Sequence, residues 1–430
     1  MAMRWLGKRW RWLIVLLFCL VAPSAVANFA IFQASQPAAG SPPASCPQGN
    51  SYPDGCTNAP VAGSFQQSTL LNGYAVRPPW NVAGVDYSVG YPTGTTLKPI
   101  FVAGVPNSSL PDQPYTFHAS GYQGQASWDS NTGGFGSMGQ NFKVQIPVSP
   151  SAFAGTIEVF DTAGETWDAW DFTGWNIAFW AGSNNTVTNS KFVASTTGSH
   201  VIEYIHDNGT AQNGTITNVE IDCAATADRA FLANRGGTFN LTYVYAHDCL
   251  SEGLQFASPE SVPTNNFTVN YSVIANTGRG ASGGAHGDWI QMFGTTNNLM
   301  DMEYITAIQN DAGGTANSQG FSIEANTNTN TTINLKNNTM VNPFNTSFSM
   351  NYQWLLSKPN TTTAINILNN YTDNAGQDIV TYGAWGTLKP DNVGTGPCTA
   401  TVTISGNIKM TNNTSMDSNY LAAGCGSGPP

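Results

Sequence analysis

The sequence predicts an all-β fold, most of it a right-handed parallel β-helix with an irregular or β-structured N-terminal cap. Charged residues make up only 10% of the chain, while the turn-forming residues Asn, Thr, Ser and Gly abound. This composition favours turn-rich β structure over helices. Strand-like runs then recur at spacings of 29, 23, 28, 32, 34, 32 and 37 residues, a period typical of a solenoid. They begin near Val187, Ile216, Phe239, Phe267, Leu299, Ile333, Ile365 and Val402.

Residues 1–27 have the features of an export signal: a basic start, a short apolar stretch and a small-residue cleavage site. The apolar stretch is too short to span a bilayer, and no second long apolar run follows. We therefore expect a secreted product, whether extracellular, periplasmic or on the cell surface, without a transmembrane segment. Four of the 15 Lys and Arg residues leave with the signal, so the mature charge is 11 − 26 = −15. Nucleic acid is thus excluded as a partner.

Six cysteines remain after the signal, an even number that suits disulfides in an exported chain. They are Cys46, Cys56, Cys223, Cys249, Cys398 and Cys425. Bridges between neighbours in sequence are favoured. Cys223 and Cys249 are 26 residues apart, close to one period, so their bridge would join adjacent coils.

The composition divides the mature chain into three parts. Residues 28–66 form a leader rich in Pro and Ser, 67–150 a cap or a small β subdomain, and 151–430 the β-helix with a C-terminal cap. Tryptophans cluster where the β-helix is expected to begin. They could form an aromatic plug or a platform on which sugar rings stack, and the plug is favoured. They are Trp167, Trp170, Trp175 and Trp180. Repeated Asn-Asn pairs predict tight corners, because asparagine tolerates left-handed backbone.

The strongest functional signal is a glycine-rich turn that delivers His286 and Asp288 to the start of a strand. Similar segments begin at Asp228, Glu252 and Gln319, and superposing them places these residues in one column with Asp288. Adjacent coils lie about 4.8 Å apart, so Asp228, Glu252 and Asp288 would offer the carboxylate separations of retaining or inverting glycosidases. The same three carboxylates could instead bind Ca²⁺ or simply accept N–H groups of their own turns.

Elimination chemistry needs a base near the C5 proton of a uronate sugar. The candidates are His286, His247, Arg279, Arg235 and Arg229. Candidate substrate-binding residues are Gln291, Gln255, Trp289 and Arg235. If the outward strand face is the functional one, the column becomes Glu203, Arg229, Gln255, Gln291 and Glu324.

The export signal, the Asn-rich coils and the His286-Gly-Asp-Trp-Ile-Gln291 corner resemble the pectin-lyase-like group of secreted right-handed β-helix proteins. The resemblance covers about 155–425, and the Asn-Thr-Asp, Asp-Asp and Arg-Ile-Lys signatures of its polygalacturonase branch are absent. It implies cleavage of a polysaccharide by hydrolysis or β-elimination, although the group includes non-catalytic surface proteins. We therefore expect a polysaccharide lyase or glycoside hydrolase with Asp288 and Glu252 as acid and base. The alternative is a glycan-binding or structural β-helix protein, and the oligomeric state stays open.

Overall fold

The computed structural model describes the solenoid and part of its N-terminal cap. The described residues are 89–92, 94–103, 105–111, 115–118, 128–129, 134–135, 144–147, 155–159, 164–180, 184–194, 200–205, 212–234, 237–258, 265–279, 287–294, 297–308, 318–325, 330–342, 354–357, 362–374, 387–389, 401–409, 414–417 and 421–422. The predicted export signal and leader lie outside them, as do Arg235, His286 and four of the six cysteines that follow the signal. Within these ranges no helix is long and apolar enough to cross a membrane.

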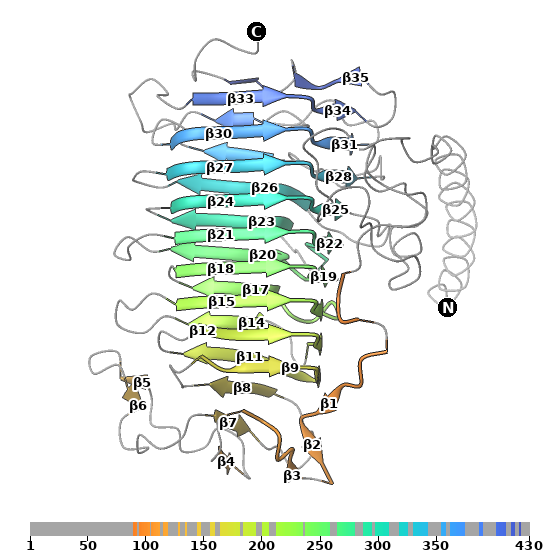
Figure 1. Ribbon diagram of the computed structural model, residues 1–430, viewed down its shortest axis with the longest axis vertical. Coiled ribbons are helices and arrows are strands. Elements are labelled where there is room, and N and C mark those ends of the chain that lie inside the picture. The colour runs from red at the N-terminus through yellow and green to blue at the C-terminus, as the bar shows by residue number, and fades with distance from the viewer. Residues whose placement is uncertain are drawn as a thin grey trace, which may run out of the picture.

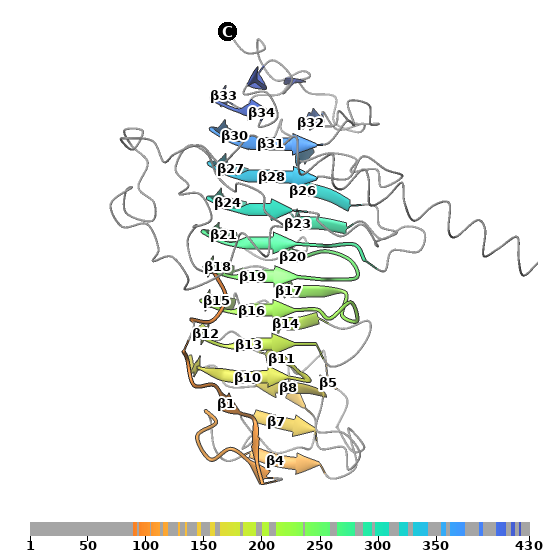
Figure 2. The ribbon, with the colours of Figure 1, turned by 90° about the vertical axis from the view of Figure 1, so that its right-hand side faces the viewer.

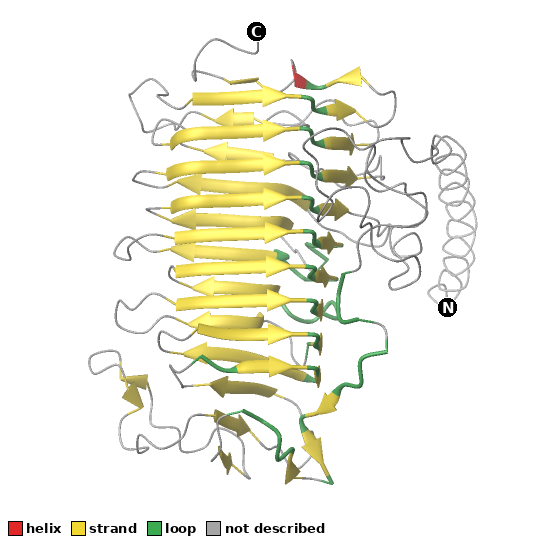
Figure 3. Ribbon diagram, viewed as in Figure 1, coloured by secondary structure: helices red, strands yellow, loops and turns green. Residues whose placement is uncertain are grey.

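Three parallel sheets run along the long axis of the molecule, and strands of successive coils stack on one another (Figures 1 and 3). One coil runs through β15 (Gln212–Thr217), β16 (Glu220–Asp222) and β17 (Arg229–Asn234), each in a different sheet. The next coil pairs with it in parallel register, so like positions form ladders. This arrangement confirms the predicted all-β parallel solenoid.

Sheet 1, of nine strands, alternates buried and partly exposed side chains, the pattern of a sheet with one wet face. Its other strands are β9 (Thr166–Asp168), β12 (Asn184–Thr188), β18 (Gly237–Thr242), β21 (Asn265–Asn270), β24 (Asn297–Glu303), β27 (Asn330–Lys336), β30 (Thr362–Leu368) and β33 (Thr401–Ser405).

Sheet 2, of eleven strands, is built mostly from short strands that each follow a sharp corner after sheet 1 (Figure 2). Besides β16 it contains β1 (Lys98–Pro99), β10 (Trp170–Thr173), β13 (Lys191–Val193), β19 (Tyr245–His247), β22 (Val273–Ala275), β25 (Thr306–Ile308), β28 (Thr339–Asn342), β31 (Tyr371–Asn374), β34 (Ile408–Lys409) and β35 (Thr414–Ser415).

Sheet 3, of twelve strands, supplies much of the core and continues into the N-terminal cap. Besides β17 it contains β4 (Tyr115–His118), β7 (Val144–Pro147), β8 (Gly155–Val159), β11 (Trp175–Trp180), β14 (His200–Ile205), β20 (Leu254–Ser258), β23 (Gly287–Gly294), β26 (Ser318–Ala325), β29 (Trp354–Ser357), β32 (Thr387–Lys389) and β36 (Leu421–Ala422). Two hairpins lie in the cap region: β2 (Phe101–Val102) with β3 (Val105–Pro106), and β5 (Trp128–Asp129) with β6 (Gly134–Phe135).

The corner between sheets 1 and 2 has one left-handed residue in each coil. These residues are Ala169, Asn189, Asn218, Tyr243, Tyr271, Tyr304, Asn337, Asn369 and Gly406. Asparagine in this conformation is stabilised by its short polar side chain. The pairs Asn337-Asn338 and Asn369-Asn370 lie at these corners as predicted, whereas the pairs that start at Asn184, Asn265 and Asn297 begin strands of sheet 1. The residue after each corner turns inward, and Asn338, Asn370 and Asn407 form a buried ladder of amide–amide hydrogen bonds.

Apolar ladders fill the interior. Ile202, Phe231 and Leu254 occupy equivalent inward positions in successive coils, and Ile290 and Phe321 continue the ladder. At the first coils Trp167, Trp170 and Trp175 are buried against neighbouring aromatic rings. These three therefore form the predicted plug and not a sugar-stacking platform, whereas the side chain of Trp180 lies outside the described part of the structure.

Candidate functional site

A row of polar side chains lies where the strands of sheet 3 begin. The register pairs His200 with Arg229 and Asp288 with Gln319. The register also pairs Phe231 with Leu254, and Leu254 with Ile290. Two residues earlier in each of these segments stand Arg229, Glu252 and Asp288, which therefore lie in one row. We call His200, Arg229, Glu252 and Asp288 the polar row. Asp228 was expected in this column, but the register puts its neighbour Arg229 there instead.

Arg229 contacts two other members of the row. Its Nε lies 2.7 Å from Glu252 Oε2, and its Nη1 lies 3.1 Å from His200 Nε2. A guanidinium group can only donate, so His200 Nε2 must accept and its proton must sit on Nδ1. That Nδ1 lies 3.2 Å from Glu203 Oε2. The imidazole of His200 therefore lies between a carboxylate at one ring nitrogen and an arginine at the other.

Burial separates the row into an accessible and an inaccessible part. Glu252 is 4% exposed and Asp288 is 0% exposed, so neither expected acid–base carboxylate faces solvent. The side chains of His200, Glu203 and Arg229 are each about a fifth exposed, at 22%, 21% and 21%. A ligand approaching sheet 3 would therefore meet the histidine, its carboxylate and the arginine, with Glu252 behind the arginine.

The outward column beside the row is only partly the one expected. Glu203, Gln255 and Gln291 occupy it, and Gln255 Nε2 donates to Gln291 Oε1. Leu232 and Ser322 hold the places at which Arg229 and Glu324 were expected. The other expected substrate-binding residue of this region, Trp289, is fully buried and has no surface to offer a sugar.

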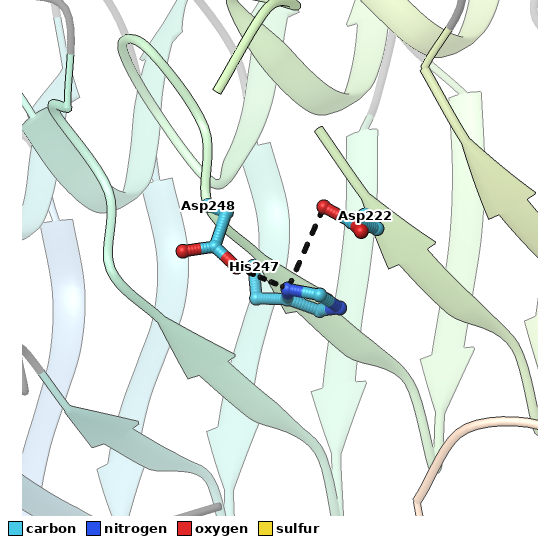
Figure 4. A group of neighbouring side chains, drawn as sticks. All are labelled: Asp222, His247 and Asp248. Carbon is cyan, nitrogen blue, oxygen red and sulfur yellow. Dashed lines mark hydrogen bonds and ion pairs between the residues drawn. The ribbon is translucent and has the colours of Figure 1, made fainter. Parts of the chain in front are cut away.

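A second cluster, the acid–histidine corner, lies on sheet 2 and in the turn after it. His247 Nδ1 lies 2.7 Å from Asp248 Oδ2 and 3.7 Å from Asp222 Oδ1 (Figure 4). His247 Nε2 lies 3.7 Å from Glu220 Oε1, too far for a hydrogen bond. Tyr245 stacks on the imidazole with ring centroids 4.0 Å apart, and this contact fixes the plane of the ring.

Charge decides the protonation of this corner. Burial lowers the pKa of His247, but the contacts with Asp248, Glu220 and Asp222 outweigh burial and raise the pKa from 6.5 to about 9. Burial raises the pKa of Asp248, but His247 and Arg279 lower it by more than burial raises it. The net pKa is therefore below its usual value, and Asp248 stays a carboxylate. Arg279 Nη1 lies 2.5 Å from Asp248 Oδ1. Both His247 and Arg279 therefore belong to this corner and not to the polar row.

A disulfide ties two coils together at this corner. Cys223 and Cys249 are bonded, as the spacing predicted, and they directly follow Asp222 and Asp248 in the chain. The bond also spans two of the turns that lead to sheet 3, because β17 and β20 begin just after it.

Sequence reasoning overlooked His200 as a functional candidate. It lies two residues before the inward Ile202, the same offset that separates Arg229 from Phe231 and Glu252 from Leu254. That shared offset was the signal that could have found it.

No family model matches the chain, and no curated protein or solved structure matches it. The parallel solenoid is thus the part of the resemblance to pectin-lyase-like proteins that the structure supports.

Proposed function

We propose that the protein is a secreted enzyme that cleaves an acidic polysaccharide by β-elimination, with His200 as the base and Arg229 as the group that binds the uronate carboxylate. The observation that carries this proposal is the chain of contacts Glu203–His200–Arg229–Glu252 on the partly exposed edge of sheet 3. The export signal and the Cys223–Cys249 disulfide support an oxidising compartment outside the cytosol.

The reaction assigns a role to each of these groups. The base removes the C5 proton of a uronate residue, the electron pair forms the C4–C5 double bond, and the C4–O glycosidic bond breaks. The departing oxygen takes a proton from solvent. Neutralising the adjacent carboxylate makes the C5 proton more acidic and stabilises the negative charge that develops on the sugar. Arg229 can supply this stabilisation, and Glu252 holds its Nε in place.

His200 is placed to act once substrate engages the arginine. In the free protein, Arg229 Nη1 donates a hydrogen bond to the lone pair of His200 Nε2. A uronate carboxylate that draws the guanidinium toward itself would release this lone pair for proton abstraction. Glu203 keeps the second ring nitrogen protonated, an orienting role that carboxylates often play for catalytic histidines. The partly exposed amide of Gln291, which accepts a hydrogen bond from the buried Gln255, then offers hydrogen bonds to a neighbouring sugar hydroxyl.

The test compares single variants on a panel of acidic and neutral glycans, with ultraviolet absorbance of unsaturated uronate as the readout. We expect H200Q to lower kcat by about 10²–10⁴-fold, the range for a lost general base. E203Q should lower kcat less, and R229K should lose activity on uronate polymers because lysine cannot form the bidentate contact. E303Q is a matched control, since Glu303 is a similarly exposed ion-paired glutamate on sheet 1.

Three results would contradict the proposal in different ways. Full elimination activity in H200Q would remove His200 from the chemistry. Shortened chains without unsaturated ends would indicate hydrolysis. Retention of glycan by the wild-type protein without any cleavage would favour the non-catalytic binding protein, and R229K would then weaken that binding.

A further inference from the structure

We propose that the acid–histidine corner is a binding site for a divalent transition-metal ion such as Zn²⁺, with His247 Nδ1, Asp222 and Asp248 as its ligands. The site is separate from the polar row and does not depend on the proposed reaction. It also differs from the Ca²⁺ site expected at Asp228, Glu252 and Asp288, which shares no residue with it.

The spacing of the ligand atoms suits one small ion. One atom from each of Asp222, His247 and Asp248 can be chosen so that all three lie within 4.8 Å of one another. Ligands at 2.0–2.1 Å from a tetrahedral Zn²⁺ lie about 3.3 Å apart. The distances from His247 Nδ1, 2.7 Å to Asp248 and 3.7 Å to Asp222, bracket that value, and an ion would have to draw the two aspartate oxygens, which lie within 4.8 Å of each other, to the same spacing.

The buried imidazole is an independent sign of a ligand. The side chain of His247 is nine-tenths buried, and its Nε2 has no hydrogen-bond partner, with Glu220 Oε1 at 3.7 Å. A histidine that binds metal through one nitrogen directs its other N–H at a carboxylate or carbonyl group. Metal on Nδ1 would place the ring proton on Nε2, facing Glu220, so a modest approach of that carboxylate satisfies both nitrogens.

Charge favours a dication at the same place. The carboxylates of Glu220, Asp222 and Asp248 carry three negative charges, and the guanidinium of Arg279 offsets one of them. Once a metal ion has displaced the proton on Nδ1, the imidazole is neutral and the other groups of the corner sum to −3 + 1 = −2. A divalent ion at this place cancels that charge.

The surroundings hold the ligands in position. The backbone N–H of Ala224 donates to Asp222 Oδ1 at 2.6 Å, and Arg279 binds Asp248 Oδ1, which leaves Asp248 Oδ2 directed at the ring. The Cys223–Cys249 bond ties together the two turns that carry the aspartates. Imidazole with two carboxylates suits zinc and its neighbours, whereas Ca²⁺ prefers six to eight oxygen ligands.

The experiment titrates Zn²⁺ into the chelator-treated full-length protein by calorimetry, with Ca²⁺ as a parallel titrant. We expect one Zn²⁺ per chain, weaker Ca²⁺ binding, and a loss of Zn²⁺ affinity of at least about tenfold in D222N and H247Q. D171N is the matched control: Asp171 lies on the same sheet and accepts a backbone N–H from two residues ahead, as Asp222 does, but Asp171 is outside the corner. D171N should bind like the wild type.

Circular dichroism and thermal unfolding of each metal-free variant show that the fold is retained. D222N, which replaces a carboxylate with an amide of the same size, keeps the test valid if H247Q fails to fold. The proposal is overturned if the wild type shows no saturable Zn²⁺ binding, or if D222N binds Zn²⁺ as tightly as the wild type. Because metal binding is measured without glycan, this result is independent of any outcome for the elimination reaction.

Discussion

The metal-free acid–histidine corner should make the stability of the protein depend on pH through His247. The perturbation is a rise in pH from about 6 to about 10 in the presence of a chelator. The pKa of His247 is raised from 6.5 to about 9 in the folded protein, because Asp248, Glu220 and Asp222 stabilise the imidazolium more than burial disfavours it. A raised pKa means that the folded state binds the proton more tightly than the unfolded chain does.

The sign and size follow from that difference. The stabilisation is complete below a pH of about 6.5, declines as the unfolded chain loses its proton, and is gone above a pH of about 9. The step from 6.5 to about 9, at about 1.4 kcal/mol per pKa unit, gives roughly 3 kcal/mol of unfolding free energy. Stability should therefore fall by roughly this amount as the pH rises through the window.

Denaturant unfolding of the wild type and of H247Q across this pH range measures the effect. Other titrating groups contribute equally to both proteins, so the difference between their unfolding free energies isolates His247. We expect this difference to shrink by roughly 3 kcal/mol between about pH 6 and about pH 10. Parallel curves for the two proteins, or an NMR titration of the His247 ring with a pKa at or below 6.5, would refute the electrostatic reasoning.

Three further predictions concern the scaffold. Replacing Cys223 and Cys249 with alanine should lower the free energy of unfolding by about 3–4 kcal/mol, the value expected for a bond that closes 26 residues, and denaturant melts measure it. Gly237→Ala should destabilise the protein by at least about 3 kcal/mol, because a Cβ there would lie 1.6 Å from a backbone oxygen of the adjacent coil; an unchanged melting temperature would contradict this. Asn370→Ala should lower the free energy of unfolding by about 3 kcal/mol, because it leaves buried partners without hydrogen bonds. Asn366→Ala, in the partly exposed ladder of sheet 1, should lower it by less than about 1 kcal/mol, and equal losses would contradict a stabilising role of the buried ladder.

The solenoid could be predicted from the sequence because its signal is repeated in every coil. Buried and partly exposed side chains alternate along strands of sheet 1 such as β15 and β18, and the left-handed corners recur, four of them with asparagine. The exact register was harder to read. The register pairs Ile216 with Leu241 and Gly214 with Phe239, whereas the sequence spacing took Ile216 and Phe239 as equivalent. A shift of two residues keeps every side chain on the same face, so the hydrophobic pattern fits both alignments.

The polar row shows where pattern reasoning ends. The superposition that placed Asp228 beside Glu252 was shifted by one residue, because the four residues from Ala230 to Ala233 are all buried and give no alternation to align. The sequence also gives residue types without their exposure. Glu252 and Asp288 were plausible acid and base until the fold placed them inside, and only the three-dimensional contacts brought His200 forward.

The two clusters depend on the same pair of turns. The first turn runs from Asp222 in the acid–histidine corner to Arg229 in the polar row, and the second runs from His247 to the strand that follows Glu252. The Cys223–Cys249 bond joins these turns, so it fixes the ligands of one cluster and the ion pair of the other at once. Reduction of this disulfide should therefore weaken Zn²⁺ binding and glycan cleavage together. D222N should affect only the metal and R229K only the glycan, because each removes a side chain without freeing the turns.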